Sequence, residues 1–183
     1  MTPANHAEQT VPMTNANEIL QDAFDRVHEL VPSAIEGLSA DELLWRPDPD
    51  ANHIAWLVWH LSRVQDDHVA GVGGVEQAWT AQGWVDRFGL PYAADTVGYG
   101  QSSDDVGAFV LSDPGLLTGY HEAVHALTGS VLEGLSDEGL ERVVDERWDP
   151  PVTMGVRLVS IVDDDVQHAG QAWYLRGLFE RAR

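Results

Sequence analysis

Two segments far apart in the chain carry histidine and carboxylate residues at metal-ligand spacing. The segment at 52–60 reads NHIAWLVWH and ends on His60, and the segment at 164–171 reads DDVQHAGQ. Asp164 and His168 are four residues apart, so on a helix they share a face and are able to hold one ion together. With His60 from another helix, they would form a three-ligand site whose remaining positions are open to water or substrate, as in reactive metal sites.

The identity of the carboxylate is open, because three consecutive aspartates precede His168. Asp165 stands three residues before His168 and would also reach an ion on that face. Two imidazoles and a carboxylate suit zinc, nickel, manganese or iron. The pattern therefore predicts a divalent metal ion. A hydrogen-bonded core histidine beside an acidic, solvated helix face would give the same pattern without a metal.

A rival motif lies at 121–125, where HEAVH matches the His-Glu-x-x-His pattern of zinc proteases. In that pattern His121 and His125 hold zinc and Glu122 activates water. Such proteases present substrate along a strand edge, but no strand alternation is evident in this sequence, and no third ligand stands out. The polar side of an amphipathic helix is the simpler interpretation.

Three further residues are candidates for positioning a ligand or a substrate. Gln171 follows His168 by three residues and would orient a ligand. Arg176 would recognise an anionic group. Asp67, further along the helix face of His60, would hydrogen-bond a ligand imidazole and fix its tautomer. Ordinary pairing or solvation on a helix surface explains each of them equally well.

The charge of the chain limits the partners that it binds. Acidic residues outnumber basic ones 30 to 10, which gives a formal net charge of −20. Such a field repels a nucleic-acid backbone and an anionic membrane surface. We therefore expect a small-molecule substrate, with neither nucleic-acid nor membrane binding. The seven Trp residues leave room for a homodimer interface.

The chain contains no cysteine, which excludes disulfides, thiolate metal ligands and a cysteine nucleophile. No run of residues has the length and apolarity of a membrane-spanning helix, and the N-terminus lacks a signal-peptide pattern. These features predict a cytoplasmic protein. Residues 1–14 are expected to form a flexible tail, and residues 15–183 a single helical domain large enough to bury a core.

Apolar residues recur at helical spacing in four long segments. They extend over about 15–37, 53–71, 113–135 and 153–183. Residues 72–101 are rich in glycine and have no long periodic pattern, with room for one short helix near 75–84. The sequence therefore predicts an all-α four-helix bundle with a long crossover between the second and third helices, and no strands.

Local signals mark two of the helix starts. Ser39 and Glu42 form a capping-box pattern that predicts a short helical turn. Asp113 followed by Pro114 predicts an N-cap with proline at the first helical position of the third long helix.

The two metal-ligand segments also resemble a known family. Residues 56–61 (WLVWHL) resemble the second helix of the DinB-like superfamily, which includes bacillithiol- and mycothiol-dependent metalloenzymes. Residues 168–171 (HAGQ) resemble the His-x-Gly-Gln ending of its fourth helix. Carried over residue by residue, the resemblance implies the ligands His60, Asp164 and His168, and favours Asp164 over Asp165. Many relatives have a histidine where this chain has Asp164; the carboxylate would strengthen cation binding but make a bound water less acidic.

The resemblance implies an enzyme that transfers a low-molecular-weight thiol of the mycothiol or bacillithiol type to an electrophilic small molecule. A divalent ion lowers the pKa of a thiol and holds it as the nucleophilic thiolate near neutral pH. A chain without cysteine is consistent with a thiol that arrives as a cosubstrate. Two other hypotheses stay open: a non-catalytic metal- or small-molecule-binding bundle that acts as a stress or sensor protein, and a zinc hydrolase built on His121, Glu122 and His125.

Overall fold

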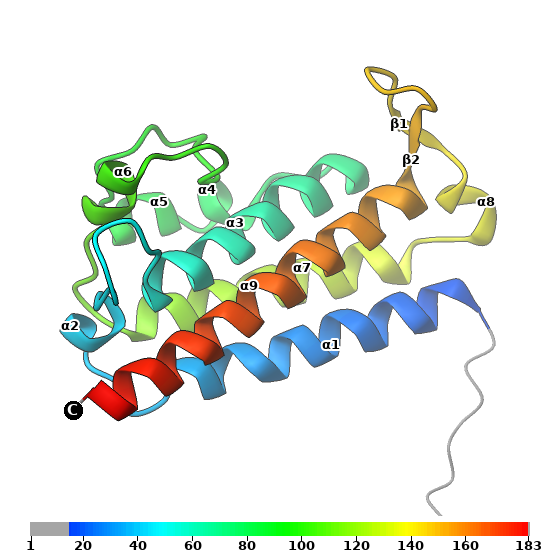
Figure 1. Cartoon of the computed structure of the whole chain (residues 1–183). Coiled ribbons are helices and arrows are strands. Elements are labelled where there is room, and N and C mark those ends of the chain that lie inside the picture. The colour runs from blue at the N-terminus through cyan, green and yellow to red at the C-terminus, as the bar shows by residue number, and fades with distance from the viewer. Residues whose placement is uncertain (1–14, 183) are drawn as a thin grey trace, which may run out of the picture.

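Four long helices pack side by side as one bundle in the computed structural model, which describes residues 15–182 (Figure 1). They are α1 (Ala16–Ile35), α3 (Ile54–Gly73), α7 (Gly115–Glu133) and α9 (Met154–Ala182). Helices α3 and α7 run in one direction, and α1 and α9 run in the other. The chain must therefore return along the bundle between α3 and α7. The predicted all-α bundle with a long crossover is confirmed, whereas the predicted N-terminal tail lies outside the described residues.

The capping signals in the sequence lie within one residue of the observed N-caps of α2 and α7. Ser39 and Glu42 form the predicted capping box ahead of α2 (Ala40–Leu43). The N-cap residue of α7 is Pro114 and not the predicted Asp113. Asp113 still accepts a hydrogen bond of 2.8 Å from the backbone N–H of the residue after Pro114, so its side chain satisfies a free donor of the first turn.

The crossover contains more helix than expected and folds back onto α3 (Figure 1). Its helices are α4 (Ala78–Ala81), α5 (Trp84–Phe88) and α6 (Ser103–Gly107). Only the first of them falls in the predicted range of 75–84. Aromatic side chains attach the crossover to the bundle: the ring of Trp79 lies 5.1 Å from that of Tyr120, and Phe109 lies 5.6 Å from Trp59. The crossover is thus a packed layer of the core.

A small hairpin corrects the prediction that the chain has no strands. After α8 (Asp137–Leu140), strands β1 (Val143–Asp145) and β2 (Val152–Thr153) pair antiparallel and project from one end of the bundle (Figure 1). Strands of three and two residues are too short to show an alternating pattern. Asp145 anchors the hairpin by pairing with Arg147 and with Arg157 of α9.

The bundle core consists of two apolar clusters with polar side chains between them. Ser62 and His121 are buried and lie 3.0 Å apart, Oγ to Nδ1, across α3 and α7. One turn further along, the Gln65 amide donates to the hydroxyl of Thr128 at 2.8 Å. Asp165 of α9 is also fully buried. The centre of the bundle is therefore polar, which is unusual for a core of this size.

A buried ion pair on α3 holds the crossover through hydrogen bonds. Arg63 and Asp66 are both fully buried, with Nη1 and Oδ2 3.5 Å apart. The carboxylate of Asp66 accepts the backbone N–H groups of Ala78 and Trp79 and the hydroxyl of Tyr120, each at 2.8 Å. Breaking such a pair on one side leaves an uncompensated buried charge.

The Asp66→Ala variant should therefore lose about 3 to 5 kcal/mol of unfolding free energy, measured by urea denaturation. The neighbouring Asp67 is 38% exposed in its side chain, so Asp67→Ala is the matched control and should lose less than about 1 kcal/mol. Equal losses in the two variants would contradict the anchoring role of Asp66.

Helix α3 begins at a histidine that must stay neutral. Nδ1 of His53 accepts the backbone N–H of Trp56 at 3.0 Å, and Nε2 donates to the carbonyl of Val106 at 3.1 Å. Burial lowers the pKa of His53 to about 4. In the unfolded chain the pKa is near 6.5, so between these values the unfolded state binds the extra proton and stability falls as pH falls.

The expected loss from this histidine is about 3 kcal/mol between pH 7 and pH 4. In His53→Asn the cap residue does not titrate, so the acid-induced loss should shrink by about that amount in urea denaturation curves recorded at both pH values. An unchanged loss would assign the acid sensitivity to other groups.

None of the helices within residues 15–182 has the length and apolarity needed to cross a membrane.

Candidate metal centre

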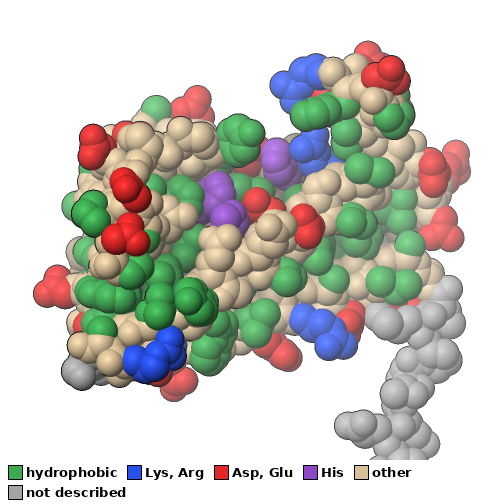
Figure 2. Space-filling view, in the orientation of Figure 1, with side chains coloured by type: hydrophobic (Ala, Val, Ile, Leu, Met, Phe, Trp, Pro, Cys, Tyr) green, Lys and Arg blue, Asp and Glu red, His purple; other side chains and the backbone are tan. Residues whose placement is uncertain are grey.

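The two predicted metal-ligand segments meet in the structure. One ligand atom from each of His60, Asp164 and His168 lies within 4.8 Å of the others, and within residues 15–182 no other group of three such residues comes this close. The first residue belongs to α3 and the other two to α9, which pack against each other along the bundle. Figure 2 shows histidine and acidic side chains together in the hollow between the crossover and the hairpin.

His60 is held in one orientation by its surroundings. Its Nδ1 donates a hydrogen bond to the carbonyl of Val97 in the crossover, and its ring stacks on that of Trp56 at a centroid distance of 4.6 Å. Because Nδ1 carries the proton, Nε2 keeps its lone pair for a metal ion. Burial lowers the pKa of His60, which favours the neutral, ligating form.

His168 presents the same nitrogen to the site. Its Nδ1 donates to Oε1 of Gln171 at 3.1 Å, and its Nε2 lies 3.6 Å from Oδ1 of Asp164. The rings of His168 and His60 meet edge to face, with centroids 4.8 Å apart. Burial lowers the pKa of His168, but the contact with Asp164 outweighs burial and the net shift is upward. Without a cation, a proton therefore stabilises the Asp164–His168 contact.

Asp164 has a free acceptor in the site. Its Oδ2 atom is buried and has no hydrogen-bond partner among the described residues. Burial raises the pKa of this carboxyl, but His168, His60 and His68 together lower it by more, so the net shift is downward and Asp164 is ionised. An ionised carboxylate with an unpaired buried oxygen, beside two imidazole nitrogens, has the donor chemistry that a divalent cation requires.

The neighbouring aspartate faces a different environment. Asp165 is completely buried, neither of its carboxylate oxygens has a hydrogen-bond partner among residues 15–182, and it does not belong to the group of three. Burial and the charge of Asp164 raise its pKa well above the usual range, so it is neutral. Consecutive residues on a helix point about 100° apart, so the geometry favours Asp164 over Asp165 as a ligand.

The structure gives the other two positioning candidates different partners. Asp67 accepts from the Gln77 amide at 2.8 Å and lies 3.4 Å from Nδ1 of His68, rather than contacting a triad imidazole. Arg176 donates to the carbonyls of Ser33 and Glu36 at the end of α1, each at 2.9 Å, and also pairs with Glu180. These contacts fasten α9 to α1 and do not involve the triad.

The residues of the His-Glu-x-x-His motif form another cluster. The ring of His125 stacks on that of His28 from α1 at 4.0 Å, and His28 also pairs with Glu122 at 2.6 Å. His121 bonds to Ser62, and burial lowers its pKa to about 3. Each member of the motif thus has a partner in the bundle. His28 stacks beside both histidines, but within residues 15–182 this cluster does not bring three ligand atoms within 4.8 Å of one another.

One residue of the crossover that contacts His60, Gly98, was not predicted from the sequence. Gly98 has φ +96°, and a Cβ atom there would lie 2.6 Å from Nδ1 of His60 and 3.1 Å from the rings of Trp56 and Trp59. Only glycine combines this backbone conformation with this close approach. The glycine-rich composition of 72–101 was a visible signal, but which glycine touches His60 depends on the fold.

Gly98→Ala should displace the crossover from His60. Gly100 also has a positive φ of +75°, but nothing lies within 4 Å of a Cβ placed there, so Gly100→Ala is the matched control for backbone strain. We expect both variants to lose about 1 to 2 kcal/mol from strain, and Gly98→Ala to lose more. NMR spectra of the imidazole groups should show a changed His60 ring in Gly98→Ala alone; the same change in Gly100→Ala would contradict the contact.

Comparison with known proteins identifies a family and similar solved structures. A family model described as the DinB superfamily matches residues 23–172. The crystal structure of a conserved protein from Enterococcus faecalis is similar to this chain with a TM-score of 0.85 and 32% sequence identity, and the match covers 91% of this chain and 98% of that one. A search of curated proteins returned no match.

Proposed function

Because the chain belongs to the DinB superfamily, whose members commonly bind divalent metals, we propose that it is a metal-dependent enzyme that transfers a low-molecular-weight thiol to an electrophilic small molecule. The observation that carries this proposal is the convergence of His60, Asp164 and His168 within 4.8 Å. Three protein ligands leave coordination positions open to a substrate.

The three side chains are suited to hold the ion in a defined way. The carbonyl oxygen of Val97 and the side-chain oxygen of Gln171 each accept a hydrogen bond from Nδ1 of one histidine. Both imidazoles therefore offer Nε2 to the ion. Such outer contacts fix the orientation of a ligand and raise its basicity. Asp164 supplies the charge that a divalent cation needs. When bound, the ion would lower the pKa of a thiol and hold it as a nucleophilic thiolate.

The surroundings supply what thiol transfer needs beyond the ion. Gly98 of the crossover and the ring of Trp56 on α3 cover His60, which is only 5% exposed, and so limit the access of water. The chain itself has no cysteine, so no internal thiol competes for the site. Mycothiol and bacillithiol are the kinds of thiol that the superfamily suggests, and the electrophile is a small molecule.

A non-catalytic metal-binding bundle is the second candidate. Asp164 favours it, because a carboxylate in place of a histidine adds negative charge and makes a metal-bound thiol less acidic. The zinc hydrolase hypothesis is not supported by the contacts of His121, Glu122 and His125, which bind partners within the bundle.

Metal content tests the site directly. Protein purified without a histidine tag should contain about one divalent ion per chain by elemental analysis. His60→Ala and His168→Ala should lose it, because each removes one of three ligands, whereas the matched control His125→Ala should retain it. A wild type that takes up no metal on dialysis would refute the proposal. Loss of metal in His125→Ala alone would show that the ion binds at the His-Glu-x-x-His motif instead.

Turnover separates the two candidate functions. The metal-loaded protein should couple a thiol to monochlorobimane, followed by fluorescence, and His60→Ala should reduce the rate to the background value. A metal-loaded protein with no turnover for thiols of several classes would favour the non-catalytic bundle.

A further inference from the structure

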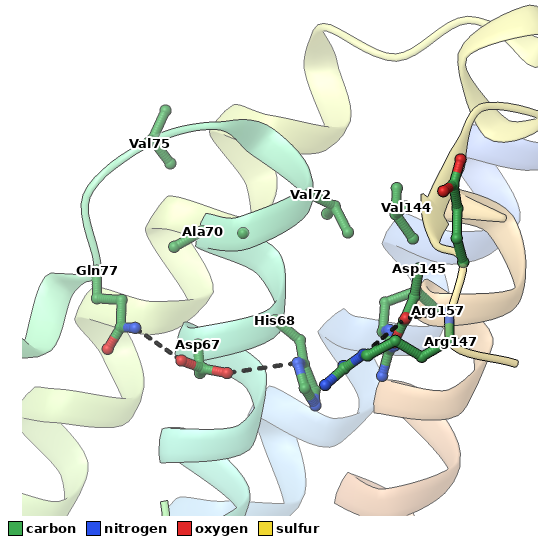
Figure 3. A pocket seen from close by; sticks show the side chains of 12 residues that line it. Asp67, His68, Ala70, Val72, Val75, Gln77, Val144, Asp145, Arg147 and Arg157 are labelled. Carbon is green, nitrogen blue, oxygen red and sulfur yellow. Dashed lines mark hydrogen bonds and ion pairs between the residues drawn. The ribbon is translucent and has the colours of Figure 1, made fainter. Parts of the chain in front are cut away.

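A cavity of about 670 Å³ lies beside α3, beneath the hairpin (Figure 3). None of the three candidate metal ligands lines it. Its polar wall comes from α3 with Asp67 and His68, from Gln77 at the start of the crossover, and from Arg157 near the start of α9. The hairpin adds Asp145, Glu146 and Arg147. The cavity therefore exists only because the hairpin stands over the groove between α3 and α9.

The cavity continues the face that carries the triad. His68 follows His60 by eight residues on α3, and Arg157 precedes Asp164 by seven residues on α9, so each pair lies on one helix face. The helical rise places the cavity residues roughly 10 to 12 Å along the bundle from the triad. Burial lowers the pKa of His68, Arg157 lowers it further, and Asp67 and Asp164 raise it. His68 is thus close enough to both the cavity arginine and the triad to respond to their charges.

Two arginines lie among three acidic residues, Asp67, Asp145 and Glu146, at this cavity. Only ten basic residues oppose thirty acidic ones, and two of the ten are Arg147 and Arg157. His68 points toward these arginines, as Figure 3 shows. The acids around them are already engaged in part: Asp67 binds the Gln77 amide, and Asp145 accepts from both guanidinium groups.

The arginines retain donors for a second carboxylate. A guanidinium has five N–H donors. Arg147 uses Nε and Nη2 to bind Asp145, and Arg157 uses Nη2 alone at 3.0 Å. The side chain of Arg157 is 21% exposed, so its other donors are within reach of the cavity. Asp145 itself shows that a carboxylate here can take the bidentate Nε and Nη2 fork of Arg147 together with a bond from Arg157. The bidentate fork is the geometry in which arginine binds carboxylates best.

We propose that this cavity binds a carboxylate at the far end of the thiol cosubstrate, whose sulfur lies at the triad. The proposal rests on the proposed function, because it assigns the thiol to the triad. Arg157, Arg147 and His68 would donate hydrogen bonds to the carboxylate. The thiol is thereby defined by its chemistry: an extended molecule with an anionic group about 10 Å from its sulfur. A neutral thiol of equal length would bind the triad but would lack the charge-assisted hydrogen bonds at the cavity.

The test compares ω-mercapto-octanoate with ω-mercapto-octanol, which differ only in the terminal group. The cobalt-loaded protein is titrated with each thiol, and binding is followed by the sulfur-to-cobalt charge-transfer band. We expect about tenfold tighter binding of the carboxylate thiol, the ratio that one charge-assisted contact gives. Arg157→Gln should bring the two affinities together by weakening the carboxylate thiol alone, and Arg157→Lys should restore part of the preference.

Two further variants separate recognition from folding. Arg147 is 85% exposed in its side chain, so Arg147→Gln should reduce the preference without harming the fold. Arg26→Gln removes the same charge from an exposed site on α1 and should leave the preference unchanged. Equal affinities of the two thiols in the wild type would overturn the proposal, and so would a preference that survives in both Arg157→Gln and Arg147→Gln.

An arm without metal distinguishes this proposal from the proposed function. The NMR signals of the Arg157 Nε–H group and the His68 ring are followed in the metal-free protein during titration with each thiol. Saturable shifts with the carboxylate thiol alone would support the cavity even if no cobalt band appears, in which case only the proposed function fails. A cobalt band without a carboxylate preference would leave the metal site standing and refute the cavity.

Discussion

The buried pair of Arg63 and Asp66 is the interaction on which the candidate site depends. Asp66 accepts the backbone N–H groups at the start of α4, and Nε of Arg63 donates to the carbonyl of Thr96 near the end of the glycine-rich segment. One pair on α3 thus holds both ends of the segment that covers His60, and Val97, the residue after Thr96, bonds to that histidine. Desolvation of two charges is costly. Hydrogen bonds from Ala78, Trp79 and Tyr120 offset part of that penalty, although burial still raises the pKa of Asp66. The pair thereby fixes the segment that holds His60 in its orientation.

The position of the triad follows from how α9 divides its faces. Asp164 and Asp165 are adjacent in sequence, yet Asp164 lies with two histidines in the groove beside α3, and Asp165 lies unpaired and neutral in the bundle. The polar layer between the two apolar clusters, with Ser62 and His121, weakens the core at this level.

The hairpin shapes the cavity at one end of the groove between α3 and α9. In the bundle alone, the groove between α3 and α9 would be open at the end beyond His68. The hairpin closes that end and carries Arg147 and Asp145 above Arg157. A metal site and a cavity with two arginines along one groove would bind the two ends of an extended molecule, so that specificity and reactivity would come from separate elements.

Periodicity determined the four long helices, and the spacing of Asp164 and His168 determined that both lie on one helix face, because these are local properties of a helix. The residues that resemble the DinB superfamily led to His60 as their partner, and the structure brings the three together. Only the tertiary structure decided that Arg176 binds the end of α1, that Gly98 covers His60, and that a hairpin exists. The physical reason is that each of these depends on contacts between residues distant in sequence, whose register no local pattern encodes.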